Sequence, residues 1–167
     1  MIELNFTYHR MQKLVAVVLI FCMTILFLSG FDIIKAKVRD IKRRADIKIL
    51  TQSLSLYYDR YGKYPDSSDD WNGWDLSISY GGGNVEFIKN LKEKGFIDKE
   101  TKDPVNNEAY HYRYQKFNAG DYGCKKPFYI LQVFNFELSS KDKGRGECPE
   151  LDWAEFATNG FTVQDFD

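Results

Sequence analysis

The first third of the chain is dominated by apolar positions. Residues 14–31 read LVAVVLIFCMTILFLSGF, eighteen positions without a charge. An α-helix rises about 1.5 Å per residue, so this stretch nearly crosses the roughly 30 Å hydrocarbon core of a bilayer. A signal peptide has a shorter apolar region and a small-x-small cleavage site, which Ser29-Gly30-Phe31 matches poorly. A core helix this uniformly apolar is rare in so small a protein. We therefore expect residues 14–31 to be a retained transmembrane helix, preceded by a short, leader-like N-terminal segment, residues 1–13.

Apolar residues continue at helical spacing after this span. They form two successive stripes: Ile34, Val38, Ile41 and Ala45, then Ile47, Leu50, Leu54, Tyr57, Tyr58 and Tyr61. Gly62 is a typical helix C-cap, and Pro65 prevents further helix. The pattern predicts one long helix from about Gln12 to Tyr61, in which residues 32–61 continue the membrane helix outward. Two helices broken near residues 30–32 are the alternative.

Residues 62–167 have the pattern of a small globular head. Turn-forming residues fill Asp66–Asp75, and Gly81-Gly82-Gly83 is a second flexible joint. A short helix follows, capped by Asn84 and closed by Gly95. Its apolar positions are Val85, Phe87, Ile88 and Leu91.

Three strands are expected after this helix. Tyr110, Tyr112 and Tyr114 alternate with polar residues, which is the period of a half-buried strand. Residues 128–134 are more apolar and predict a central strand, and residues 160–163 predict an edge strand. The fold class expected is α+β, with a long N-terminal membrane-spanning helix packed on a small antiparallel sheet.

The composition is that of a protein with a packed core, and it does not indicate nucleic-acid binding. The chain has 167 residues, of which 44% are hydrophobic and 16% aromatic, so disorder over most of its length is excluded. Lys and Arg number 23 against 24 Asp and Glu, which gives no general argument for nucleic-acid binding. The positive charge is concentrated after the span, where residues 32–48 carry seven basic and three acidic side chains.

Cysteine usage bears on the compartment. Cys124 and Cys148 lie beside turn formers in the head, and we expect them to form a disulfide, which persists outside the cytoplasm and adds roughly 3 kcal/mol of stability. A metal site is the competing interpretation, and it lacks ligands because His9 and His111 are the only histidines. Cys22 lies within the apolar span and is expected to behave as a small apolar side chain.

Catalytic chemistry is not indicated. The sequence suggests no nucleophile and base pair, and the glycine triplet lacks the Lys-Ser/Thr ending of a phosphate loop. Four acidic side chains in Asp66–Asp75 offer oxygen ligands for Ca²⁺, yet their spacing matches no EF-hand, so a solvated loop is preferred. We expect a protein that is not an enzyme and has no cofactor or metal, with Trp71, Trp74 and Trp153 in the core.

The end of the long helix and the segment after it resemble a known family. Leu54, Tyr57, Gly62, Tyr64 and Pro65 match its Leu-x-x-Tyr and Gly-x-Tyr-Pro pattern. Gly95-Phe96-Ile97, Asp103-Pro104 with Asn107, and Tyr110-His111-Tyr112 then follow in the order of its Gly-Tyr-Leu, Asp-Pro-x-x-Asn and Tyr-x-Tyr motifs. Over residues 14–115 the chain therefore resembles type II secretion pseudopilins and other type IV pilin-like proteins.

This resemblance implies a structural subunit. The subunit would assemble with itself and other pilin-like subunits into a membrane-anchored filament for type II secretion or a related pilus-like system. It would depend indirectly on an inner-membrane platform and a secretion ATPase. The basic segment Lys35–Arg44 is expected to contact anionic membrane lipid or an acidic surface of a neighbour, so charge reversal of Arg43 and Arg44 is expected to weaken self-association. The alternative function is a monomeric, membrane-tethered extracytoplasmic binding protein.

Processing and orientation depart from the simplest family pattern. Asn5 and Arg10 stand where pilin-like precursors carry the glycine before the cleavage point and the later glutamate. Leader cleavage and an uncleaved anchor therefore both remain open. The basic flank after the span favours a cytoplasmic head, whereas the expected disulfide and the resemblance favour the outside. We expect a single-pass protein of the cell membrane whose head is extracytoplasmic.

Overall fold

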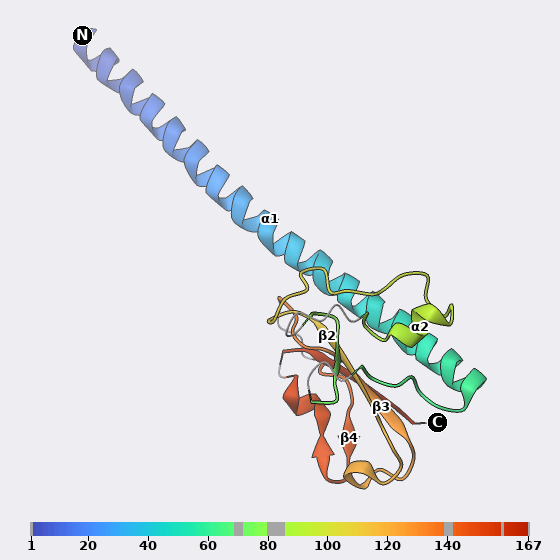
Figure 1. Cartoon of the computed structure of the whole chain (residues 1–167). Coiled ribbons are helices and arrows are strands. Elements are labelled where there is room, and N and C mark those ends of the chain that lie inside the picture. Colours follow the sequence, from blue (N-terminus) through green and yellow to red (C-terminus); the bar gives the residue numbers. More distant parts are fainter. Residues whose placement is uncertain (1, 69–71, 80–85, 139–141, 158, 167) are drawn as a thin grey trace. The chain divides into compact units, whose positions relative to one another are not determined.

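The computed structural model describes residues 2–68, 72–79, 86–138, 142–157 and 159–166 (Figure 1). The elements in chain order are α1 (Ile2–Tyr61), β1 (Asp75–Leu76), α2 (Lys89–Glu93), β2 (Tyr112–Phe117), a 3₁₀ turn η1 (Asp121–Gly123), β3 (Phe128–Val133), β4 (Glu147–Cys148), β5 (Leu151–Asp152), a second 3₁₀ turn η2 (Trp153–Phe156) and β6 (Phe161–Phe166). The chain divides into two compact units, Met1–Val38 and Arg39–Asp167. The second unit, called the head below, therefore includes the last part of α1.

Helix α1 is longer than the sequence pattern predicts. It begins at Ile2 and not near Gln12, and it continues through Gly30 and Asp32, where a break was the alternative. One glycine costs a helix only about 1 kcal/mol, and no proline precedes Pro65. The helix ends as expected: Gly62 has a φ of 66° and donates its N–H to the carbonyl of Tyr58 at 2.7 Å, which is a left-handed C-cap.

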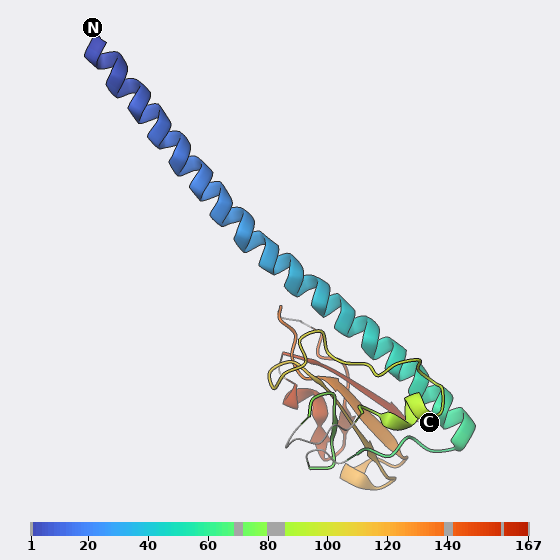
Figure 2. The same cartoon turned by 45° about the horizontal axis from the view of Figure 1, so that its top comes forward.

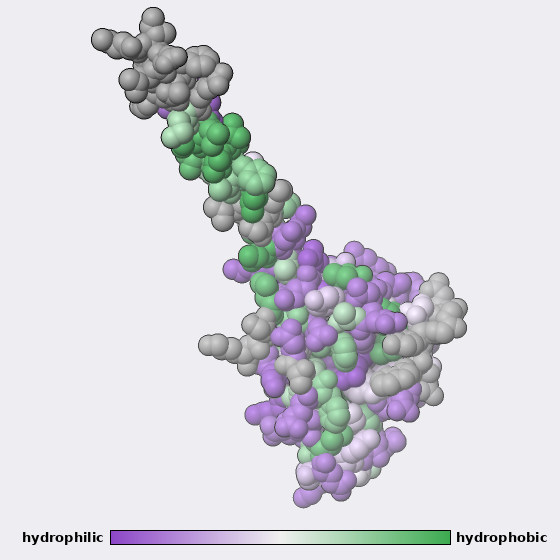
Figure 3. Space-filling model, turned by 90° about the vertical axis from the view of Figure 1, so that its left-hand side faces the viewer, coloured by the Kyte–Doolittle hydropathy of each residue, from purple (hydrophilic) through white to green (hydrophobic). Residues whose placement is uncertain are grey.

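The apolar part of α1 has no protein cover within its own unit. The large apolar side chains between Met11 and Ile25 are exposed, for example Leu14 at 65% and Ile20 at 63%. Figure 3 colours the described residues of this segment as hydrophobic. Within the part of the chain that the structure describes, α1 is the one helix that is long and apolar enough to cross a membrane.

The sheet of the head has the strand order β1-β2-β3-β6, and every pairing is antiparallel. β3 lies between β2 and β6, so Phe128–Val133 is the central strand, as predicted for residues 128–134. β6 is the edge strand predicted at residues 160–163, but it extends to Phe166 because it pairs with β3 along its whole length. β2 begins at Tyr112, so the prediction that Tyr110 and His111 belong to the strand is wrong. Tyr110 is instead held in a turn, where its N–H donates to the side chain of Asn107 at 2.9 Å.

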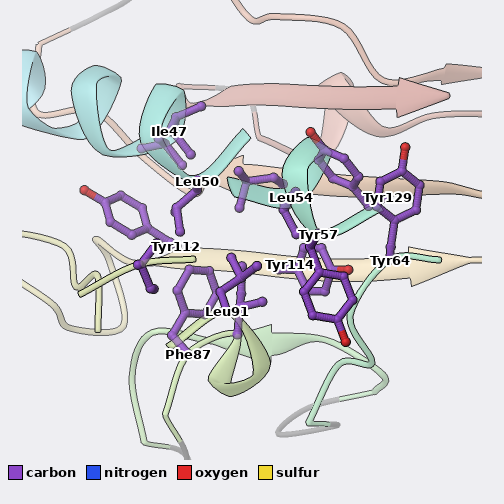
Figure 4. Close-up of a cluster of buried hydrophobic side chains, with 14 of the residues drawn as sticks. Ile47, Leu50, Leu54, Tyr57, Tyr64, Phe87, Leu91, Tyr112, Tyr114 and Tyr129 are labelled. Carbon is purple, nitrogen blue, oxygen red and sulfur yellow. The ribbon is translucent and has the colours of Figure 1, made fainter. Parts of the chain in front are cut away.

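Helices α1 and α2 cover one face of this sheet, as the two views in Figures 1 and 2 agree. The last turns of α1 contribute Ile47, Leu50, Leu54 and Tyr57 to a buried cluster. These side chains point toward tyrosines of β2 and β3 and toward Leu91 of α2 (Figure 4). The apolar stripe of residues 47–61 therefore supplies the main core of the head, since burial of such side chains stabilises a fold by about 1.5–3 kcal/mol each.

The opposite face of the sheet is covered as well. A second cluster contains Trp74, Leu76, Ile78, Phe117, Cys124, Phe128, Ile130, Cys148 and Trp153. Trp74 and Trp153 are in the core as expected, whereas Trp71 lies outside the described residues. The prediction of a half-buried β2 is wrong, because Cys148 of the β4–β5 hairpin and Trp153 of η2 pack in the same cluster as Phe117 on its second face. Asp75 also opens β1 and is buried, so it is not part of a solvated loop.

Helix α2 is shorter than predicted. It begins at Lys89, because Ile88 adopts a left-handed conformation with φ 45° and donates its N–H to the Asp75 carboxylate at 2.9 Å. Its end is the predicted one: Gly95 and Phe96 donate to the carbonyls of Lys92 and Leu91, which is a Schellman motif. The expected cap Asn84, the apolar position Val85 and Gly81–Gly83 lie outside the described residues.

Two leucines of α1 provide a matched test of this packing. Leu54 has no exposed surface, whereas Leu56, two residues later, is 57% exposed. Leu54→Ala should lower the free energy of unfolding by about 2–5 kcal/mol, because it leaves a cavity between helix and sheet. Leu56→Ala should change it by about 0.5 kcal/mol or less. Urea unfolding of the full chain in detergent measures both, and equal losses would contradict this account of the core.

Candidate functional site

A buried arginine at the start of the head connects three parts of its chain. Arg43 of α1 has no exposed surface. Its Nε and Nη2 donate to the two carboxylate oxygens of Asp103 at 2.6 and 2.9 Å. Its Nη1 donates to Asp40 at 2.6 Å and to Glu137 at 2.9 Å. One guanidinium therefore joins α1 to the turn before β2 and to the segment after β3.

The carboxylates around Arg43 are themselves held in place. Asp40 accepts the backbone N–H groups of Glu137 and Leu138, at 3.0 and 2.9 Å. Asp103 accepts those of Val105 and Asn106, at 2.8 and 3.2 Å, which forms the turn of the Asp-Pro motif. These bonds leave few carboxylate lone pairs unused, as a buried ion cluster requires.

Arg39 extends the cluster toward solvent. Its Nε donates to Glu137 at 2.6 Å. Hydrogen bonds from Arg39 and then from Arg43 lower the pKa of Glu137, although burial opposes the shift. The carboxylates that accept from Arg43 raise its pKa despite its burial, so the arginine is charged at any pH at which the protein is folded.

The cluster corrects the expectation for the basic segment Lys35–Arg44. Arg43 is unavailable to lipid or to a neighbour, because its donors are used inside the head. Charge reversal there would place a fourth carboxylate among three, so it would unfold the head before it could report on self-association. Arg44 is different: its side chain is 42% exposed and lies over the rings of Phe136 and Phe161.

The side of α1 that faces away from the sheet carries a second apolar stripe. It consists of Ile41, Ala45, Ile49 and Leu56, with the polar Gln52 among them, and all five side chains are exposed. Ile41, Ile49 and Leu56 are exposed at 59%, 51% and 57%. At 100° per residue these positions lie opposite Leu50 and Leu54. We call this set the outer stripe.

A hollow borders the outer stripe on each side. One, of about 470 Å³, lies between α1 and the edge strand β6 and is lined by Ile47, Phe161 and Val163 with Arg44 and Lys48. The other, of about 540 Å³, lies between α1 and the segment after α2, and Asp46, Ile49 and Phe96 contribute to it. The outer stripe is therefore a raised apolar ridge between two grooves, a shape that suits packing against another helix.

The two head cysteines are joined as predicted. Cys124, after η1, forms a disulfide with Cys148 at the end of β4, and their Cα atoms are 5.3 Å apart. The amide of Gln164 in β6 donates toward Cys148 Sγ at 3.2 Å. The bond ties the β4–β5 hairpin to the sheet. Cys22 is a free, exposed cysteine of the apolar segment.

Other candidate residues do not form a reactive group. His111 stacks on Phe134 at 4.5 Å between ring centres, and burial lowers its pKa, so it is neutral near pH 7. Asp66 forms an ion pair with Lys116, which lowers the Asp66 pKa. Asp69, Asp70 and the side chain of His9 lie outside what the structure describes. Among the described residues, no three His, Cys, Asp or Glu side chains are placed to hold a metal ion.

Sequence reasoning did not find the Arg43 cluster. Its members are separated by up to 98 residues, and they resemble ordinary surface charges in the sequence. The one available signal was Asp103, which the resemblance had selected as a motif residue without giving it a partner.

Comparison of the chain with protein-family models, with curated proteins and with solved structures gives no match. The structure itself defines an α+β protein with a long apolar N-terminal helix, a small antiparallel sheet and one disulfide.

Replacing Arg43 should be far more damaging than replacing its neighbour. Arg43→Met removes the charge that compensates three carboxylates and should lower the free energy of unfolding by about 3–5 kcal/mol. Arg44→Met removes a half-exposed side chain, and the expected loss is about 1 kcal/mol or less. Chemical denaturation of the two variants under the same conditions makes the comparison. A small loss for Arg43→Met would show that the cluster does not hold the helix to the sheet.

Proposed function

We propose that this protein is a pseudopilin-like structural subunit that assembles through α1 into a membrane-anchored filament, for type II secretion or a related pilus-like system. The observation that carries the proposal is the outer stripe. The apolar segment 14–31 is explained by a membrane anchor alone. The outer stripe is not, because Ile49 and Leu56 lie beyond the charged residues 32–48 that follow the span, and Ile41 lies among them.

Exposed apolar side chains in a continuous stripe are costly to hydrate and usually mark an interaction surface. Each large side chain of the outer stripe would contribute about 1.5–3 kcal/mol if fully buried. In this proposal, the same face of helices from neighbouring copies and other pilin-like subunits covers the stripe. The apolar segment of each subunit leaves the lipid for the same helical core.

The layout of the head supports the family assignment. Leu54 and Tyr57 pack on the sheet, Gly62 ends the helix, and the carbonyl of Pro65 accepts the Tyr114 hydroxyl at 2.8 Å. Asp103 forms a turn and accepts from Arg43. The motif that ends α1 and the Asp-Pro motif thus each have a structural task at a junction between helix and sheet, which favours a pilin-like fold.

We propose an extracytoplasmic head on a single-pass anchor. The Cys124–Cys148 disulfide supports this orientation, because such bonds persist in oxidising compartments. The basic flank is a weaker argument for the opposite orientation, since long soluble regions translocate largely regardless of charge. The role is assembly and not catalysis, with the force supplied indirectly by a secretion ATPase and an inner-membrane platform. A monomeric tethered binding protein is the rival, and it has no use for the outer stripe.

Cross-linking in the membrane tests self-association. We would introduce Gln52→Cys into a Cys22→Ser background and treat native membranes with a bismaleimide, which should give covalent dimers, because each subunit then carries one reactive thiol. Adding Ile49→Ser and Leu56→Ser should reduce the cross-linked fraction at least about tenfold, since 1.4 kcal/mol of lost burial already corresponds to tenfold. Unfolding of the head should change by about 1 kcal/mol or less, because both side chains are exposed.

Phe156→Ser is the matched control. Phe156 is 57% exposed, like Leu56, and lies in η2, away from α1 in the sequence. Its replacement should leave the cross-linked fraction unchanged. If no species above the monomer forms through Gln52→Cys, the filament proposal fails and the monomeric tether is preferred.

The redox state of the thiols tests the compartment. Protein extracted from its own membrane and alkylated without reduction should carry one adduct, at Cys22, since the other two cysteines are bonded. Intact-mass measurement should also show a mass two hydrogens lower than that of the fully reduced chain, and it reports any loss of the first five residues. Three adducts on a full-length chain would place the head in the cytoplasm and rule out a secretion role.

A further inference from the structure

A second buried arginine, Arg113 of β2, has very different surroundings from Arg43. It is 7% exposed and lies on the face of the sheet opposite α1. Its strand neighbours are Leu76 of β1 and Gln132 of β3. Nine-tenths of this guanidinium-bearing side chain is therefore removed from water.

The contacts of Arg113 fix its orientation without neutralising its charge. Its Nε donates to Gln132 Oε1 at 2.5 Å. Its guanidinium carbon is 4.5 Å from the ring centre of Trp74 and 5.1 Å from that of Phe134. Gln132 is itself locked, because its amide nitrogen donates to the Trp153 carbonyl and the Thr162 hydroxyl, both at 2.8 Å.

No carboxylate in the described part of the chain pairs with Arg113. Burial alone lowers its pKa to about 10, with no carboxylate to raise it, and at neutral pH it is still charged. Two aromatic rings offset only part of the cost of burying a cation. The same protein surrounds its other buried arginine, Arg43, with three carboxylates.

The N–H groups of Arg113 that make no hydrogen bond within the described part of the chain can donate to an external anion. A guanidinium has five N–H groups, and Gln132 occupies the one on Nε. Nη1 and Nη2 are not among the described polar atoms that are sealed from solvent without a partner. These two nitrogens form the end-on edge that binds a carboxylate with two parallel hydrogen bonds. The guanidinium carbon lies over the rings of Trp74 and Phe134, so these cation–π contacts hold the plane of the guanidinium in place.

We propose that Arg113, with Trp74 and Phe134, is a binding site for a carboxylate group. The carboxylate comes either from a small soluble acid or from a side chain or C-terminus of another copy of this chain. The site does not depend on the outer stripe, so it stands whether or not the protein forms filaments.

Acetate is the probe, and the full chain in detergent is the sample. At constant ionic strength, replacing chloride by acetate should raise the Tm by about 3 °C and then saturate, because a ligand that binds only the folded state stabilises it. Arg113→Met should abolish this shift. Arg113→Lys keeps the positive charge but lacks the two parallel Nη donors of the guanidinium, so it should reduce the shift. Arg145→Met, at an exposed arginine, should retain it. A shift that persists in Arg113→Met, or an absent shift in the wild type, overturns the proposal.

A second measurement uses the wild type and so does not depend on how the variants fold. Acetate should slow the phenylglyoxal modification of Arg113 severalfold, as read from peptide masses, and leave that of Arg145 unchanged. Equal rates at Arg113 with and without acetate would contradict the site.

The source of the carboxylate is resolved by the same reagents. If it belongs to another copy, acetate and Arg113→Met should each lower the cross-linked fraction obtained through Gln52→Cys. If it belongs to a small acid, that fraction should be unchanged while the Tm response to acetate is retained.

Discussion

The head of this protein is organised around the charge of Arg43. Apolar burial between α1 and the sheet supplies most of the stabilising free energy, but the hydrophobic effect has no direction of its own. A guanidinium bonded to Asp40, Asp103 and Glu137 has fixed donor directions, so it adds a directional constraint to the packing. The cluster therefore sets the register of the helix against the turn before β2 and the segment after β3. Removal of Arg43 takes the shared positive charge away from all three of these carboxylates.

Because Arg43 fixes the orientation of α1 on the sheet, the two sides of this part of the helix have different surroundings. The side toward the sheet carries the core residues Leu50 and Leu54, with Arg43 at its start. The opposite side carries the apolar outer stripe, where a surface helix of a monomer would normally be polar. A tethered domain that acts as a monomer would not need apolar residues on this exposed side of the helix. A subunit whose helix is covered by its neighbours would need them, which is why the outer stripe gives the proposed assembly its strongest support.

The two buried arginines differ in their surroundings, and this difference distinguishes an arginine with a structural role from one that we propose binds an anion. Both lie in the head, and both make a directed bond from Nε. Arg43 forms ion pairs with three carboxylates of its own chain, so its role is to stabilise the fold. Arg113 is held by one amide and two rings, and its outer edge retains donors. Burying a cation in this way is explained by an anion that arrives from outside.

The sequence by itself determined the features that depend on neighbouring residues. Local periodicity and turn chemistry predict the apolar run, the stripe of residues 47–61, the glycine caps at Gly62 and Gly95, the central strand and the first part of the edge strand. The extension of the edge strand to Phe166 depends on its pairing with β3. The disulfide was predicted because the head contains two cysteines, each beside turn-forming residues. Only the tertiary structure shows which residues bury the face of the sheet opposite α1, that Asp75 belongs to β1, and which groups contact Arg43 and Arg113. These features depend on which distant segments meet, and a charged residue in a sequence does not show whether a counter-charge will reach it.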